Sequence, residues 1–146
     1  MIGCRLAGAE RIVAIDLSEV RLAEARHHGA TDTRAAAADT VDWIRGETGG
    51  FGADYTFEAT GNVGVMRQAV EAAREAWGLA TMCGVAGTSF GGVKGRSQVP
   101  QLVERWLAGE IEVDRLVTSR VPLDAVNDAF AAMERQDGIR TVIEFR

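Results

Sequence analysis

RIVAIDLSEVRLAEARHHGATD, residues 11–32, is the stretch that decides the fold of this chain. It opens on an apolar run that ends at Asp16 and shows no polar alternation, which is typical of a strand covered by helices on both faces. Ser18 is suited to cap a following helix that runs to His28, and Gly29 can provide the left-handed residue at the helix exit. The stretch therefore predicts a strand, a helix and a return to a second strand.

The same alternation of strands and helices continues to the end of the chain. Further strands are expected at 29–35, 53–61, 78–85, 115–123 and 139–145, and further helices within 39–50, 63–76, 99–108 and 123–136. Residues 86–98 contain four glycines and two basic residues, so they are expected to form a loop. Because helices of this length separate the strands, the connections should be right-handed crossovers in a parallel sheet. The predicted fold class is α/β.

Composition and charge indicate a single soluble domain. The 146 residues suffice for one ordinary domain, and 47% apolar with 25% charged residues is typical of globular proteins. A net charge of −5 gives no reason to expect nucleic acid or an anionic membrane as partner, and no apolar run approaches the length of a membrane span. The first ten residues do not resemble a signal peptide, and Cys4 and Cys83 fit reduced, buried thiols. We therefore expect a cytoplasmic protein.

Three stretches of the sequence together resemble one enzyme family. They are the opening stretch, DYTFEATGNVGVMRQAVEA at 54–72, and TSFGGVKGRS with the carboxyl-terminal run that ends in GIRTVIEF. In this order they are similar to the coenzyme-binding half of the zinc-dependent medium-chain alcohol dehydrogenases. FEATGN, FGGVKGRS and GIRTV favour the class III branch, the S-(hydroxymethyl)glutathione dehydrogenases. The resemblance implies a Rossmann-type doubly wound parallel sheet that binds NAD, in an enzyme that transfers hydride between an alcohol and NAD.

Compared with that family, three parts are expected to be missing. The catalytic domain with its zinc ligands would lie upstream. The first strand and its G-x-G-x-x-G turn would lie just before Cys4, where MIG stands. A loop and a strand would separate CGVA from GTSFGG, which are continuous here. We therefore expect an incomplete sheet, and a fragment in which residues 1–146 are a partial dinucleotide-binding domain, with an internal deletion, followed by the carboxyl-terminal segment of the dehydrogenase.

Asp16 is the best-placed candidate for binding the cofactor. A carboxylate at the end of the second strand of such a sheet can accept both hydroxyls of the adenosine ribose, and its charge favours NAD over NADP. The alternative is that Asp16 only caps the next helix. The resemblance places Arg21 near the same ribose and Arg140, in GIRTV, at the pyrophosphate, where a guanidinium fork can hold two phosphate oxygens. Both arginines have the alternative of being surface charges.

The ends of later strands supply the other candidate residues. Thr60 and Gly61 close one strand, and Gly84 and Val85 close the next, at the edge where open α/β sheets bind ligands. The resemblance implies that backbone groups at these turns, and around Phe90 in TSFGG, contact adenosine and the nicotinamide amide. No catalytic residue is predicted within the chain.

No metal site is predicted. Zinc belongs to the full-length family, whose ligands lie in the domain that is expected to be missing. His27 and His28 are adjacent, so on a helix they point about 100° apart, and neither cysteine is near them in the sequence. The two histidines are expected at the exposed end of a helix, where they favour the negative end of its dipole.

The missing parts limit the function that the sequence predicts. A glycine-rich turn would give the pyrophosphate several hydrogen bonds, each worth about 1.5–3 kcal/mol, so NAD binding is expected to be weak or lost, and turnover negligible. A second hypothesis is a non-enzymatic module that pairs with a partner chain to complete a split dehydrogenase; a homodimer is also open. A third is an S-adenosylmethionine methyltransferase, which also places an acid after its second strand, but FEATGN and GIRTVIEF disfavour it.

Overall fold

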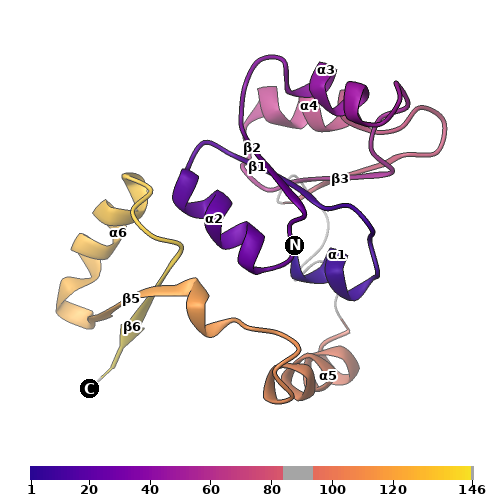
Figure 1. Ribbon diagram of the computed structural model, residues 1–146. Helices are drawn as coiled ribbons and strands as arrows, with labels where there is room; N and C mark the ends of the chain where they lie inside the picture. The colour runs from indigo at the N-terminus through magenta and orange to yellow at the C-terminus, as the bar shows by residue number, and fades with distance from the viewer. Residues whose placement is uncertain (84–93, 146) are drawn as a thin grey trace. The chain divides into compact units, whose positions relative to one another are not determined.

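The computed structural model describes residues 1–83 and 94–145 (Figure 1). Its helices and strands, in chain order, are α1 (Ile2–Leu6), β1 (Val13–Asp16), α2 (Glu19–His27), β2 (Asp32–Ala35), α3 (Thr40–Glu47), β3 (Tyr55–Glu58), α4 (Val63–Ala72), β4 (Leu79–Met82), α5 (Gly95–Leu107), β5 (Val117–Pro122), α6 (Val126–Glu134) and β6 (Arg140–Glu144), with short 3-10 helices at Asp114–Leu116 and Leu123–Ala125. The chain divides into two compact units, one formed by 1–34 with 95–146 and the other by 35–94.

The predicted α/β class with parallel strands is confirmed. β3 pairs with β4 in parallel, with Tyr55 opposite Leu79, and β5 pairs with β6 in parallel, with Arg120 opposite Val142. β1 pairs with β2, so the described strands form three two-stranded sheets.

The opening stretch folds largely as predicted. Ser18 is the N-cap of α2, with extended backbone, and its side chain accepts a hydrogen bond from the third residue that follows. Gly29 leaves the helix at φ +103°. Leu22 is 2% exposed and packs with Ala14 and Ala30 in a small core between β1 and α2. Only one face of β1 is buried, however: Ile15 is exposed, contrary to the prediction of helices on both faces.

Two helix boundaries differ from the prediction. α4 ends at Ala72 rather than at 76, because Ala73 forms a parallel bridge with Ala53 and the N–H of Arg74 donates to the Ala53 carbonyl. The backbone here leaves the helix to pair with the segment that precedes β3. α5 begins at Gly95 rather than at 99, so the last part of the predicted loop is helical. Residues 86–93 of that loop lie outside the described residues.

In the second unit, α4 packs on β3 and α3 lies beside α4 (Figure 1). The hydroxyl of Thr56 donates to the Ala69 carbonyl at 2.8 Å, which ties β3 to α4. Residues alternate along β3, so Glu58 shares the face of Thr56 and is buried, whereas Tyr55 and Phe57 lie on the other face and are exposed. The helix-covered face of this strand pair is therefore where a buried side chain can be held.

Gly52 and Gly50 allow a matched test of packing in this unit. They have nearly the same left-handed backbone, with φ of +87° and +89°. A Cβ on Gly52 would lie 2.7 Å from the Ala72 carbonyl oxygen and 2.9 Å from that of Ala73, whereas a Cβ on Gly50 would meet nothing within 4 Å. Gly52→Ala should therefore lower the free energy of unfolding by about 1–3 kcal/mol more than Gly50→Ala, measured by urea denaturation. Equal losses would contradict this reading.

Candidate functional site

Asp16 is the last residue of β1, as predicted. Its Oδ1 accepts a hydrogen bond from the Ser18 N–H at 2.9 Å and lies 3.6 Å from a guanidinium nitrogen of Arg21. The carboxylate is about one-third exposed, and Oδ2 has no hydrogen-bond partner within 1–83 and 94–145. One oxygen of Asp16 thus supports the turn into α2, while the other is available to a ligand. The structure also brings Arg21 and Asp16 together, the two residues that the sequence places near the same ribose.

Arg140 occupies the first position of β6 and is exposed. Its guanidinium donates to the carbonyl of Ile139 at 2.9 Å. Within the described residues it makes no contact with Asp16, so the structure places the two predicted residues on separate elements of the same unit.

Thr60 and Gly61 are brought together by Glu58, a residue that the sequence analysis did not single out. Glu58 ends β3 and is 1% exposed. Its Oε1 accepts three hydrogen bonds, from the N–H and the hydroxyl of Thr60, both at 2.5 Å, and from the N–H of Gly61 at 3.0 Å. The two predicted residues themselves are exposed. A buried carboxylate therefore holds an exposed turn.

The hydrogen bonds continue from this turn to the start of α4. The Thr60 hydroxyl oxygen accepts the N–H of Asn62 at 3.1 Å, and the Asn62 Oδ1 accepts the N–H groups of Gly64 and Val65 at 2.8 and 3.2 Å. Asn62 is thus the N-cap of α4. We call Glu58, Thr60, Gly61 and Asn62 the β3 turn.

The hydroxyl of Thr60 holds the pKa of the Glu58 carboxyl below its usual value, and the N–H groups of Thr60 and Gly61 act in the same direction, against the effect of burial. Glu58 is therefore ionised at neutral pH. Its second oxygen, Oε2, is buried without a hydrogen-bond partner among the described residues. The signal used for Asp16, an acid at the last position of a strand, does not point to Glu58, because the sequence predicts a strand that runs to residue 61, whereas β3 ends at Glu58.

The remaining candidate residues are Gly84, Val85 and Phe90. They lie within 84–93, outside the described residues. The described chain before them ends at Cys83, whose N–H donates to the backbone carbonyl of Glu58 at 2.6 Å. Both cysteines are free, as predicted, but Cys83 is exposed and Cys4 is half-buried, so the prediction of buried thiols is wrong.

The two adjacent histidines do more than complement a helix dipole. His28 is buried, and its Nε2 lies 3.2 Å from Glu24. The Nε2 of His27 lies 2.6 Å from Glu112, and Arg115 contacts Glu24 at 3.2 Å. These pairs join α2 to the segment that follows α5, and His27 holds the pKa of Glu112 below its usual value.

The described residues do not fit a zinc ion. No group of three or more histidine, cysteine, aspartate or glutamate side chains within 1–83 and 94–145 is arranged to hold a metal. No helix in the same part of the chain is long and apolar enough to cross a membrane.

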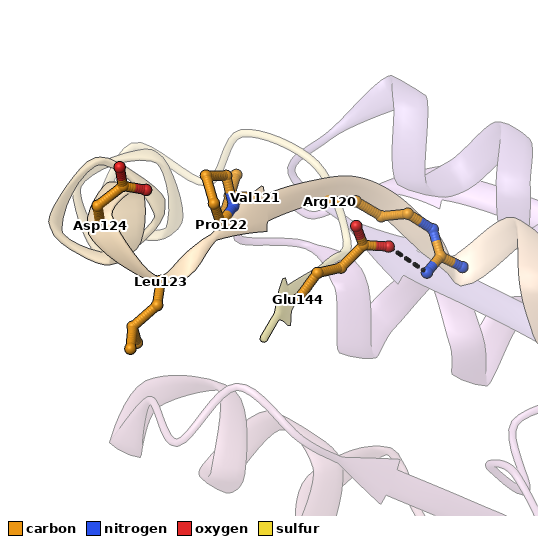
Figure 2. Close-up of a pocket in the computed structure, with 6 residues that line it drawn as sticks. All are labelled: Arg120, Val121, Pro122, Leu123, Asp124 and Glu144. Atoms are coloured by element: carbon orange, nitrogen blue, oxygen red, sulfur yellow. Dashed lines mark hydrogen bonds and ion pairs between the residues drawn. The ribbon is translucent and has the colours of Figure 1, made fainter. Parts of the chain in front are cut away.

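A shallow hollow of about 650 Å³ lies beside β5 and β6 (Figure 2). It is lined by Arg120, Val121, Pro122, Leu123, Asp124 and Glu144. Arg120 and Glu144 point toward each other and form an ion pair at 3.3 Å, which neutralises the charge of both. None of the predicted site residues lines this hollow, so it adds nothing to the candidate site.

Parallel strands that alternate with helices, with acidic side chains at the carboxyl ends of β1 and β3, define a Rossmann-like domain. Solved structures agree on this fold. The benzyl alcohol dehydrogenase of Acinetobacter calcoaceticus matches with a TM-score of 0.86 at 24% identity, over 99% of this chain and 45% of that one. An alcohol dehydrogenase zinc-binding domain protein from Burkholderia ambifaria matches with a TM-score of 0.82 at 30% identity, over 99% of this chain and 44% of that one.

Sequence comparison identifies the family. The family described as zinc-binding dehydrogenase matches residues 1–103, and the chain belongs to it. The class-3 alcohol dehydrogenase of Myxine glutinosa is 39% identical over 99% of this chain, and the S-(hydroxymethyl)glutathione dehydrogenase of Haemophilus influenzae is 38% identical over 98%. These matches confirm the predicted resemblance to the class III branch.

The chain spans less than half the length of these relatives, 44% of each. The alignment to the Myxine glutinosa protein covers 166 positions against the 146 residues of this chain, so at least 20 positions of the relative have no counterpart here. That difference agrees with the predicted internal deletion.

Thr60 allows a test of what keeps Glu58 ionised. Thr60→Val removes the hydroxyl donor and should raise the pKa of Glu58 toward its usual value, whereas Thr60→Ser keeps the donor and the low pKa. Because the folded-state pKa is lowered, ionised Glu58 adds stability above the pKa of an unfolded glutamate, and this is lost as the pH falls through the folded-state pKa. Carboxyl ¹³C NMR titration measures the shift, and identical titrations of the two variants would contradict it.

Proposed function

We propose that this chain is the coenzyme-binding part of an NAD-dependent, zinc-type alcohol or S-(hydroxymethyl)glutathione dehydrogenase. Residues 1–146 then form a partial dinucleotide-binding domain with the carboxyl-terminal segment of the enzyme. The relatives named above support the reaction class. The observation that carries cofactor binding is Asp16, which ends β1 with one oxygen in the turn and the other without a partner in the described chain.

Each unit offers its own groups to the cofactor. In the first unit, Asp16 accepts the hydroxyls of the adenosine ribose, Arg21 holds that carboxylate in place, and Arg140 offers donors to the pyrophosphate. In the second unit, Thr60 and Gly61 present exposed backbone at the end of β3. Gly84, Val85 and Phe90 are proposed, from the sequence alone, as further contacts of the cofactor. NAD, when bound, accepts the hydride.

We further propose a cytoplasmic location, weak NAD binding and negligible turnover by the chain alone. The described residues hold no cluster suited to zinc. Activation of the alcohol by a zinc ion would therefore need metal ligands from outside the described residues. The methyltransferase hypothesis is not retained, because the dehydrogenase family covers 1–103.

NADH titration tests cofactor binding directly. Purified chain, shown to be folded by circular dichroism, should bind NADH saturably, followed by the fluorescence of the nicotinamide. Asp16→Asn should weaken binding by about ten- to a hundred-fold, because hydrogen bonds to a charged group are worth about 1.5–3 kcal/mol. Asp128→Asn, an exposed acid in the first turn of α6, is the matched control and should leave the affinity unchanged. A folded chain that does not bind NADH would overturn the proposal.

A second candidate function is a module that a partner chain, or a second copy in a homodimer, completes. The two-stranded sheets of the described residues favour it, because an unpaired strand edge can pair with a strand from another chain.

A peptide tests this second candidate. The first strand and glycine-rich turn of the Myxine glutinosa relative, added as a synthetic peptide, should strengthen NADH binding by the chain at least ten-fold, because the turn brings backbone donors for the pyrophosphate. A peptide of the same composition in scrambled order is the control. Equal effects of the two peptides would contradict the candidate.

A further inference from the structure

Glu58 is a buried charge that the proposed set of cofactor-binding residues does not use. Its side chain shares the face of β3 that bonds to α4 through Thr56, and it is 1% exposed. Glutamate is rarely buried to this extent unless it is paired or hydrogen-bonded. No cation contacts it among the described residues, so its hydrogen bonds must balance its charge.

All of those hydrogen bonds come from the turn that follows the strand. Oε1 accepts two backbone N–H groups and one hydroxyl from Thr60 and Gly61, which fixes the backbone at both residues. Gly61 has φ +73°, a conformation that a tight turn requires. Through the hydroxyl of Thr60 and the cap at Asn62, the same anchor sets the start of α4.

The backbone of Glu58 holds a second strand end. Its carbonyl accepts the N–H of Cys83, the residue that follows β4, at 2.6 Å. One residue thus fixes the carboxyl ends of both β3 and β4, the edge at which open parallel sheets bind ligands. The anchor is buried, whereas Thr60 and Gly61, which it holds, are exposed.

Oε2 of Glu58 indicates that fold stability alone does not explain the carboxylate. This oxygen is buried without a hydrogen-bond partner in the described chain, which is unfavourable for folding. A neutral amide could accept the same bonds at Oε1, but bonds to an ionised acceptor are shorter and stronger. The carboxylate therefore gives a more rigid turn than an amide would, although its Oε2 has no partner in the described chain.

We propose that Glu58 is a positioning residue of the cofactor site: its buried carboxylate holds the β3 turn so that the exposed backbone of Thr60 and Gly61 is preorganised to contact NAD. This inference rests on the proposed function. It adds a residue that does not touch the cofactor and acts through the two that do. A preorganised turn loses less conformational freedom on binding, so its effect appears in affinity.

The test compares NADH affinity across four chains, each shown to be folded by circular dichroism. Glu58→Gln and Thr60→Val should each weaken NADH binding about ten-fold relative to the unchanged chain, because Thr60→Val removes a hydrogen bond to the charged carboxylate and Glu58→Gln replaces that charged acceptor with a neutral one. Thr60→Ser retains the hydroxyl and should recover the affinity that Thr60→Val loses. If Glu58→Gln does not fold, the Thr60→Val and Thr60→Ser pair decides the question by itself.

The double variants separate positioning from a general loss of structure. The double variant Glu58→Gln/Thr60→Val should bind NADH about as tightly as the single variant with the lower affinity, because both changes loosen the same turn and their effects do not add. Glu58→Gln with Asp16→Asn should show the product of the two single effects. In ¹⁵N spectra, NADH should shift the amide signals of Thr60 and Gly61 in the unchanged chain and shift them less in Glu58→Gln.

Two negative results have different meanings. If the unchanged, folded chain does not bind NADH, the proposed function fails and the role of Glu58 falls with it. If the unchanged chain binds and the folded Glu58→Gln and Thr60→Val chains bind equally well, only the role of Glu58 is overturned.

Discussion

Twice in the part of the chain that the structure describes, a strand ends on a carboxylate that accepts the N–H of the residue two positions further on. Asp16 accepts from Ser18 at the end of β1, and Glu58 accepts from Thr60 at the end of β3. In both cases a capped helix follows, so the acid sets the direction in which the chain leaves the strand. The geometry of both strand ends, and of the helices after them, depends on these two charge-assisted bonds.

Burial distinguishes the two acids. Asp16 is about one-third exposed beside Arg21, and its second oxygen can meet a ligand. Glu58 is buried, and its effect on a ligand must pass through Thr60 and Gly61. In the proposed function, the same local arrangement therefore serves to bind a ligand directly at Asp16 and to position the backbone that binds it at Glu58.

Local patterns predicted much of this molecule, and long-range packing accounts for what they missed. The caps at Ser18 and Gly29 follow from side-chain and backbone preferences within one turn of helix, and the structure confirms both. The end of α4 at Ala72 depends on a bridge from Ala73 to Ala53, some twenty residues away, which no helical periodicity reveals. The predicted boundary of a helix or strand is wrong where the backbone pairs with a segment distant in the sequence.

The candidate site shows the same division. An acid at a strand end is visible in the sequence, and Asp16 is a candidate on that ground, whereas Arg21 is a candidate only through the family resemblance. Glu58 is buried because its face of β3 packs against α4. His28, at the end of α2, is also buried, although its position at a helix end predicted exposure. A sequence pattern shows the type of a charged residue, whereas the packing of neighbouring elements decides whether it meets solvent.

The position of the single tyrosine on the outer face of β3 has a practical consequence. Tyr55, the single tyrosine of the sequence, lies on that face with 66% of its surface exposed, on the side of the strand opposite Glu58. In NMR spectra its ring is a built-in reporter for this strand, because the signals of a single tyrosine can be told apart from those of the three tryptophans that dominate the absorbance and fluorescence of the chain. Whatever comes to cover the strand pair on that side can be followed without attaching a label.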